Sequence, residues 1–277
     1  DEHYNEDLNI IKTKFTQLMN VGVKQFAILA DDAGNVGGEN YTRTLTDMTA
    51  WLKKMQKTYP DLKLTLPFCT QEYMYNGQGY YRNFPENIQI VMTGGRVWGE
   101  VTNDFTTTFT NNVGRGPYMW INWPCTDNSK KHLIMGGYTT FLHPGVDPNK
   151  IQGIVLNPMQ QSEPSKVAIF GNACYSWNIW QSEEEAQKCW NASFKYVDHN
   201  SALETKASAA LRELSKHMIN QNMDGRVTAL QESVDLKDRL ASFKEAISNG
   251  TTISDEQFED LINAAKVYNF KKCECYL

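Results

Sequence analysis

The chain has 277 residues, enough for one large domain or a medium domain with a smaller companion. Hydrophobic residues make up 41% and charged residues 21%, a globular composition that excludes wholesale disorder. With 27 basic and 32 acidic residues the formal charge is −5, which argues against nucleic-acid binding, and the apolar runs are too short to form a membrane span.

The region up to about residue 180 alternates between helical periodicity and short apolar runs. Apolar residues spaced three and four apart predict a helix over residues 8–19, and the run at 24–30 predicts a buried strand. A second helix is expected over 45–57. Further strands are expected over 62–68, 88–92, 117–122 and 151–156.

These strands are apolar along most of their length and alternate with helices, which predicts an α/β fold with a parallel sheet covered on both faces. From Ser182 onward the pattern changes to capping boxes at Ser182/Glu185, Ser201/Glu204 and Ser254/Gln257, each followed by a helical stripe. The sequence therefore predicts a domain over 1–181 and an all-helical domain over 182–277. Stripes of this kind also suit a dimer or a docking partner.

The six cysteines form no Cys-x-x-Cys pair and no His stands at a metal-ligand spacing, so no metal site is expected. Cys69, Cys125 and Cys174 lie in apolar or aromatic stretches, which favours buried free thiols. Cys273 and Cys275 are too close for an unstrained bridge. No nucleotide-binding loop, dinucleotide fingerprint or serine-hydrolase elbow occurs, which argues against those chemistries.

Two adjacent carboxylates, Asp31 and Asp32, follow the first apolar strand. Mutual repulsion and partial desolvation raise the pKa of one such acid, so that it can donate a proton near neutral pH while its neighbour stays charged. Neighbouring strand residues face opposite sides, so both reach one pocket only if the strand stops at Asp31. A solvated turn, a helix cap or a metal-dependent carboxylate site are the alternatives.

The later strands also end in polar residues, at the edge where parallel α/β folds carry their reactive groups. Tyr73 follows the second strand, Thr93 ends the third and Asn157 follows the fifth. The alternatives are a packed aromatic ring for Tyr73 and an Asn-Pro turn for Asn157, while the glycines after Thr93 allow close backbone approach.

The fourth strand end is the richest in groups that suit a sugar. It interleaves a large apolar ring, either Trp120 or Trp123, with the amide of Asn122 and the carboxylate of Asp127. A pyranose places its CH groups against an aromatic face and its hydroxyls against planar polar groups. The alternative is a Trp-rich core strand with a polar turn.

Four segments, VGVKQFAILADD, FCTQEY, WINWPCTD and VLNPMQQSEPSKVAIFGNACYSWN, resemble in that order the catalytic domain of glycoside hydrolase family 84. The family includes O-GlcNAcases and bacterial β-N-acetylglucosaminidases, and the resemblance covers about residues 5–185. It implies a (β/α)₈ barrel followed by a helical domain. It also implies a retaining exo-β-N-acetylglucosaminidase that needs no cofactor and removes terminal β-GlcNAc from a glycan or glycoprotein.

The resemblance also implies roles for individual residues in a substrate-assisted reaction, in which the 2-acetamido oxygen attacks the anomeric carbon and forms an oxazoline. Asp31 would orient the acetamido N–H and stabilise its developing charge, and Asp32 would be the general acid. Among the substrate-binding residues, Tyr73 would hold the acetamido group, and Thr93 and Trp120 would line the pocket floor. The sugar hydroxyls would be bound by Asn122, Asp127 and Asn157.

One departure from the family pattern is large: the family barrel begins three strands earlier. Five strands leave two sheet edges open, so we expect the missing segment, roughly 100–150 residues, to be a separate chain or a cleaved fragment that serves as a partner. The alternative is a truncated or inactive carbohydrate-binding relative. The motifs favour a secreted, bacterial-type address over a nucleocytoplasmic one.

Overall fold

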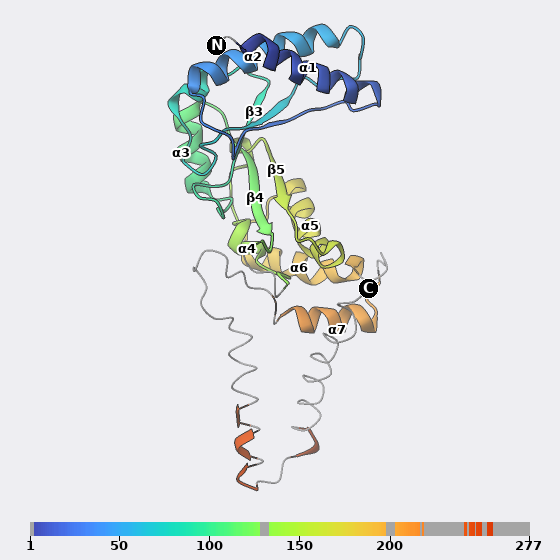
Figure 1. Ribbon diagram of the computed structural model, residues 1–277. Helices are drawn as coiled ribbons and strands as arrows, with labels where there is room; N and C mark the ends of the chain where they lie inside the picture. The colour runs from blue at the N-terminus through green and yellow to red at the C-terminus, as the bar shows by residue number, and fades with distance from the viewer. Residues whose placement is uncertain are drawn as a thin grey trace. The chain divides into compact units, whose positions relative to one another are not determined.

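The computed structural model describes residues 3–127, 133–197, 203–216, 218, 241–242, 244–246, 248–250 and 254–256. The chain forms two compact units, Asp1–Asn122 with Phe141–Leu156, and Trp123–Thr140 with Asn157–Leu277. The elements in chain order (Figure 1) are α1 (Tyr4–Asn20), β1 (Ile28–Leu29), α2 (Gly38–Met55), β2 (Leu66–Cys69), η1 (Gly79–Asn83), β3 (Ile88–Met92), α3 (Asn103–Val113), β4 (Tyr118–Pro124), α4 (Tyr138–Phe141), η2 (Pro148–Lys150), β5 (Gly153–Asn157), α5 (Ser162–Trp177), α6 (Glu183–Val197) and α7 (Lys206–Ser215).

The predicted sheet is confirmed: five strands lie in the order β1-β2-β3-β4-β5, and the pairs β1–β2, β2–β3 and β3–β4 are parallel. A spatial order that follows the sequence order is the order of a β/α barrel, whereas a doubly wound sheet reverses direction part-way. The carboxyl ends of the strands therefore share one edge of the sheet.

The first strand is much shorter than the 24–30 run predicted from its apolar residues. Only Ile28 and Leu29 pair with β2, and the segment before them keeps a single backbone hydrogen bond, from Lys63 N to the oxygen of Lys24 at 2.7 Å. As an edge strand, β1 has one neighbour, and Leu29 is 52% exposed. The apolar run indicated burial that a single neighbour does not supply.

The core of the first unit comes from helix faces with the expected spacing. Leu45, Met48 and Leu52 of α2 are almost fully buried, as are Leu66 and Ile88 of the sheet. Aromatic pairs add specific contacts: the rings of Phe15 and Phe26 stack at 4.3 Å, and Tyr41 meets Phe68 edge-on at 5.3 Å. These contacts join α1 to the segment before β1, and α2 to β2.

The second unit packs aromatic side chains among its helices. The rings of Tyr138 and Trp180 stack at 5.6 Å, and Tyr175 meets Trp180 edge-on at 4.7 Å. Two of its buried indoles end on backbone carbonyls, with Trp123 donating to Gly136 and Trp190 to Met135, both at 2.7 Å. Each polar tip is thus satisfied inside the core, as buried indoles require.

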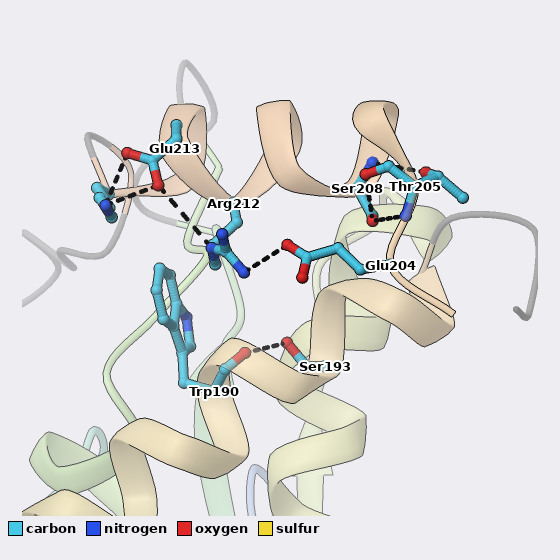
Figure 2. Close-up of polar contacts among 8 residues, drawn as sticks. Trp190, Ser193, Glu204, Thr205, Ser208, Arg212 and Glu213 are labelled. Atoms are coloured by element: carbon cyan, nitrogen blue, oxygen red, sulfur yellow. Dashed lines mark hydrogen bonds and ion pairs between the residues drawn. The ribbon is translucent and has the colours of Figure 1, made fainter. Parts of the chain in front are cut away.

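Two of the predicted helix starts can be judged. Ser182 accepts a hydrogen bond from the backbone of Glu185 at 3.2 Å before α6, which confirms that cap. The start predicted at Ser201/Glu204 is wrong, because α7 begins at Lys206 behind a reciprocal capping box of Thr205 and Ser208 (Figure 2). Glu204 instead accepts from Arg212 at 2.8 Å.

Several expectations fall outside the described residues: Ser201, Gln257 with the stripe that follows it, Cys273 and Cys275. Among the cysteines that the structure describes, the prediction of free thiols holds: Cys69 and Cys125 are free and buried, and Cys174 is free and half-buried. In the described part of the chain, no helix has the length and apolarity needed to cross a membrane. The predicted boundary between 1–181 and 182–277 stays a prediction.

Candidate active site

The two adjacent acids lie in the turn that follows β1. Ala30 still donates to the carbonyl of Cys69 at 2.9 Å, and the N–H of Ala33 turns back to the carbonyl of Ala30 at 3.3 Å. Asp31 is half-buried and Asp32 is exposed. The strand therefore stops before Asp31, which is the condition under which both carboxylates can serve one site.

The charges of both carboxylates contribute to the raised pKa values of Cys69, at the end of β2, and of Tyr73, on the loop after it. Burial, followed by the negative charges of Asp32 and Asp31, raises the pKa of Tyr73. Burial, followed by the same two charges, raises the pKa of the Cys69 thiol to about 12. Since Ala30, directly before the acid pair, is hydrogen-bonded to Cys69, the turn with Asp31 and Asp32 lies beside the end of the strand that leads to Tyr73.

Thr93, at the end of β3, holds the backbone of Tyr73. Its N–H donates to the Tyr73 carbonyl at 3.1 Å, and its hydroxyl lies 3.4 Å from the same oxygen and 2.5 Å from the carbonyl of Arg96. The side chain is buried, with 3% of Thr93 exposed. The predicted place of Thr93 on a pocket floor stays a prediction, while the contacts show that it fixes the Tyr73 loop.

Strand β4 resolves the choice between its two tryptophans. Residues along β4 alternate in burial: Trp120 and Asn122 are half-buried, whereas Trp123 is 0% exposed. The indole of Trp120 donates to Asn122 Oδ1 at 3.0 Å, and Asn122 Nδ2 donates to the carbonyl of Val97 at 2.7 Å. Trp120 is thus the accessible ring, and its neighbouring amide is held in a fixed orientation.

The remaining two predicted residues, Asp127 and Asn157, belong to the second unit. Asp127 is exposed and lies next to Cys125, whose thiol pKa is raised to about 11 by burial and by the Asp127 carboxylate. Asn157 is the last residue of β5 and is half-buried. Their roles in sugar binding stay predictions.

Sequence reasoning missed a hydrogen-bonded network beside Tyr73. Tyr80 donates its hydroxyl proton to Glu72, and the hydroxyls of Thr70 and Tyr81 share a hydrogen bond at 2.8 Å. The backbone N–H of Glu72 in turn donates to the Thr70 hydroxyl at 3.1 Å. The only signal in the sequence was a carboxylate directly before Tyr73 at a strand end.

A shallow polar pocket of about 320 Å³ lies beyond the end of β3. Its lining includes Gly94, Gly95, Arg96, Asp104 and the ring of Phe105. Arg96 is paired there with Glu100 at 2.7 Å. Within the ranges that the structure describes, no three His, Cys, Asp or Glu side chains are grouped to hold a metal ion.

A sequence profile of the family described as beta-N-acetylglucosaminidase matches residues 2–216. Among solved structures, CpGH84D is similar with a TM-score of 0.75 and 29% identity, over 100% of this chain and 46% of its own. CpGH84B is similar with a TM-score of 0.71 and 22% identity, over 100% of this chain and 48% of its own. A mutant of the Thermobaculum terrenum O-GlcNAc hydrolase is similar with a TM-score of 0.64 and 19% identity, over 97% of this chain and 59% of its own. The chain thus spans about half the length of the solved structures that it matches.

Proposed function

The chain belongs to the beta-N-acetylglucosaminidase family, glycoside hydrolase family 84, and from this premise we propose that its protein hydrolyses terminal β-linked N-acetylglucosamine. The observation that carries the proposal is geometric: Ala30, directly before the acid pair, donates to the carbonyl of Cys69 at 2.9 Å, so the acid turn lies beside the end of β2, which leads to Tyr73. Two carboxylates and a neutral hydroxyl thus share one edge of the sheet. These groups are the ones that an acetamido sugar needs for substrate-assisted hydrolysis.

In the proposed reaction the acetamido oxygen of the substrate attacks the anomeric carbon and forms an oxazoline, so the anomeric configuration is retained after water opens it. Asp31 orients the acetamido N–H and stabilises the positive charge that develops there. Asp32 protonates the leaving oxygen and then removes a proton from the attacking water.

Tyr73 is proposed to hold the acetamido group through its hydroxyl. A tyrosine hydroxyl keeps its proton at neutral pH and can donate a hydrogen bond, and burial followed by the charges of Asp32 and Asp31 raises the pKa of Tyr73 further. Thr93 supports this position by binding the Tyr73 carbonyl.

Strand β4 is proposed to supply the contacts to the sugar ring. Trp120 offers an accessible aromatic face, and Asn122, whose amide is already oriented by Trp120 and Val97, offers a planar polar group for the hydroxyls. Asp127 and Asn157 are proposed as the further hydroxyl ligands.

The test is hydrolysis of a chromogenic N-acetylglucosaminide by the natural full-length protein and by its Asp32→Asn variant. We expect the variant to lose roughly 10²- to 10⁴-fold in rate, because a general acid contributes about that much. Asp61→Asn is the matched control, since Asp61 is exposed and pairs only with Lys24 among its described contacts, at 2.7 Å. Equal rates for wild type and Asp32→Asn would remove Asp32 from the role. Sugar binding without turnover by the wild type would favour the carbohydrate-binding alternative.

A further inference from the structure

Tyr80 makes contacts in two directions. Its hydroxyl donates to the carboxylate of Glu72, the residue directly before Tyr73. Its ring covers Gly38 so closely that a Cβ atom on Gly38 would lie 2.7 Å from the Cγ and Cδ2 atoms of the ring. No larger residue fits at position 38 without moving Tyr80.

The two contacts reach the two segments that carry the candidate reacting groups. Gly38 is the first residue of α2, and the loop of residues 31–37 that leads into it begins with Asp31 and Asp32. Glu72 lies on the loop after β2 with Tyr73. One side chain from η1 thus touches the start of the helix after the acid loop and the carboxylate next to Tyr73.

We propose that Tyr80 and Glu72 are positioning residues that hold Tyr73 in register with the Asp31–Asp32 pair. The inference rests on the proposed function, since it concerns the geometry of that site. Neither residue touches substrate in this scheme; both act through Tyr73.

The hydroxyl is the part of Tyr80 that packing alone does not explain. The ring is one of a cluster, meeting Tyr81 edge-on at 4.8 Å and Phe84 at 5.8 Å, and a phenylalanine would fill the same space. A hydrogen bond from a hydroxyl to an ionised carboxylate is shorter and stronger than a neutral one. Burial, together with the Glu72 bond, raises the pKa of Tyr80 well above its usual value, so this donor keeps its proton at working pH.

The Glu72 end of the contact is itself braced. Its N–H donates to the Thr70 hydroxyl at 3.1 Å, and that hydroxyl is bonded to Tyr81 at 2.8 Å. Glu72 therefore has its backbone tied to β2 and its carboxylate tied to η1. Such a two-point hold limits how far the adjacent Tyr73 can shift.

A double-mutant cycle in the natural full-length protein tests the proposal. We expect Tyr80→Phe to lower kcat/KM for an aryl N-acetylglucosaminide by roughly 5- to 10-fold, no more than removal of the Tyr73 hydroxyl itself, because the variant displaces that group without removing it. In a Tyr73→Phe background the same change should cost less than about twofold, since residues that act through one another are not additive. Glu72→Gln, which keeps an acceptor for Tyr80, should retain more activity than Glu72→Ala.

The controls separate positioning from folding and from failure of the proposed function. Tyr59→Phe removes a tyrosine hydroxyl that donates to Asn20 at 2.6 Å on an exposed surface, and it should leave kcat/KM unchanged. Equal losses from Tyr80→Phe in both backgrounds, or wild-type kinetics for Tyr80→Phe, would overturn the inference while leaving the proposed function intact. An inert wild-type protein would overturn both.

Discussion

The two compact units use the same aromatic residue types in opposite ways. In the first unit, Tyr73 is half-buried on the loop after β2, and Trp120 is half-buried within β4. In the second, the hydroxyl of Tyr138 donates to the carbonyl of Val167 at 2.5 Å and Trp123 is fully buried. What distinguishes a candidate ligand from a core residue is therefore the surroundings of the polar group on the aromatic side chain, more than the residue type.

The difference arises from what surrounds each tip. The carboxyl ends of parallel strands meet at one edge, so polar residues from several strands gather where no helix covers them. In the second unit, aromatic rings pack between helices, where an unpaired donor would carry a desolvation penalty, and the tips of Trp123, Tyr138 and Trp190 end on backbone carbonyls. Variants can test this difference between the candidate site at the sheet edge of the first unit and the aromatic core of the second.

The largest expected effect contrasts two tryptophans of one strand. Trp123→Ala should lower the free energy of unfolding by about 3–5 kcal/mol, because it empties a fully buried site. Trp120→Ala should cost clearly less stability but raise KM for an N-acetylglucosaminide roughly tenfold, since it removes a face for the sugar. Denaturant unfolding and steady-state kinetics measure the two effects. A reversed result, with Trp120 the more destabilising, would break the comparison.

The next effect is on the pH dependence of stability. The pKa of Cys69 is raised from 9.0 to about 12 and that of Cys125 from 9.0 to about 11. A raised pKa means that the folded state holds the proton more tightly, so this stabilisation is complete below pH 9 and is lost as the pH rises towards the folded value. Each thiol should contribute a downward slope of up to about 1.4 kcal/mol per pH unit.

Variants of the two thiols separate the units in the same titration. Cys69→Ala should flatten the slope between pH 9 and about 12, and Cys125→Ala only between pH 9 and about 11. Asp31→Asn should narrow the pH range over which Cys69 contributes to the slope, because the Asp31 charge, after burial, helps to raise the pKa of that thiol. Denaturant midpoints measured under reducing conditions give the slopes. If the pH range of the Cys69 slope is the same in Asp31→Asn, the Asp31 charge does not act on the thiol.

A smaller effect contrasts two tyrosine hydroxyls. Tyr138→Phe should lower stability by about 1–2 kcal/mol, because the buried carbonyl of Val167 loses its donor, and should leave kcat per folded molecule unchanged. Tyr73→Phe should do the reverse: kcat/KM should fall roughly tenfold with little change in the unfolding midpoint. Loss of stability without loss of activity for Tyr73→Phe would assign it to the core.

The smallest effects concern helix caps, which should not distinguish the units. Thr102 accepts from the N–H of Phe105 at the start of α3, and Thr205 accepts from that of Ser208 at the start of α7. Thr102→Ala and Thr205→Ala should each cost about 1 kcal/mol in denaturant unfolding. Thr205→Ala should cost no more than Thr102→Ala, since the reciprocal bond to the Ser208 hydroxyl is donated by the backbone N–H of residue 205, which alanine keeps. A much larger loss at Thr102 would indicate a role beyond capping.

Much of the first unit could be predicted because its signals are local. The bounds of β3 follow from a run of apolar residues, and the places of Asp31 and Tyr73 after β1 and β2 follow from where such runs stop. The predicted strand end at Asn122 is wrong, because β4 continues to Pro124. The length of β1 could not be predicted, because pairing depends on how many neighbours a strand has. The helix start predicted from Ser201 and Glu204 is wrong because the helix is capped a few residues later, by the reciprocal capping box of Thr205 and Ser208.

By itself the sequence determined the α/β class, the five parallel strands and the acid pair at the end of the first one, since periodicity and strand-end chemistry are properties of neighbouring residues. Only the tertiary structure decided that Trp120 rather than Trp123 is the accessible ring, and that Tyr80 joins Gly38 to Glu72. Those facts depend on burial and on contacts between segments far apart in the chain. No local pattern encodes them, because they exist only once the strands and helices have packed.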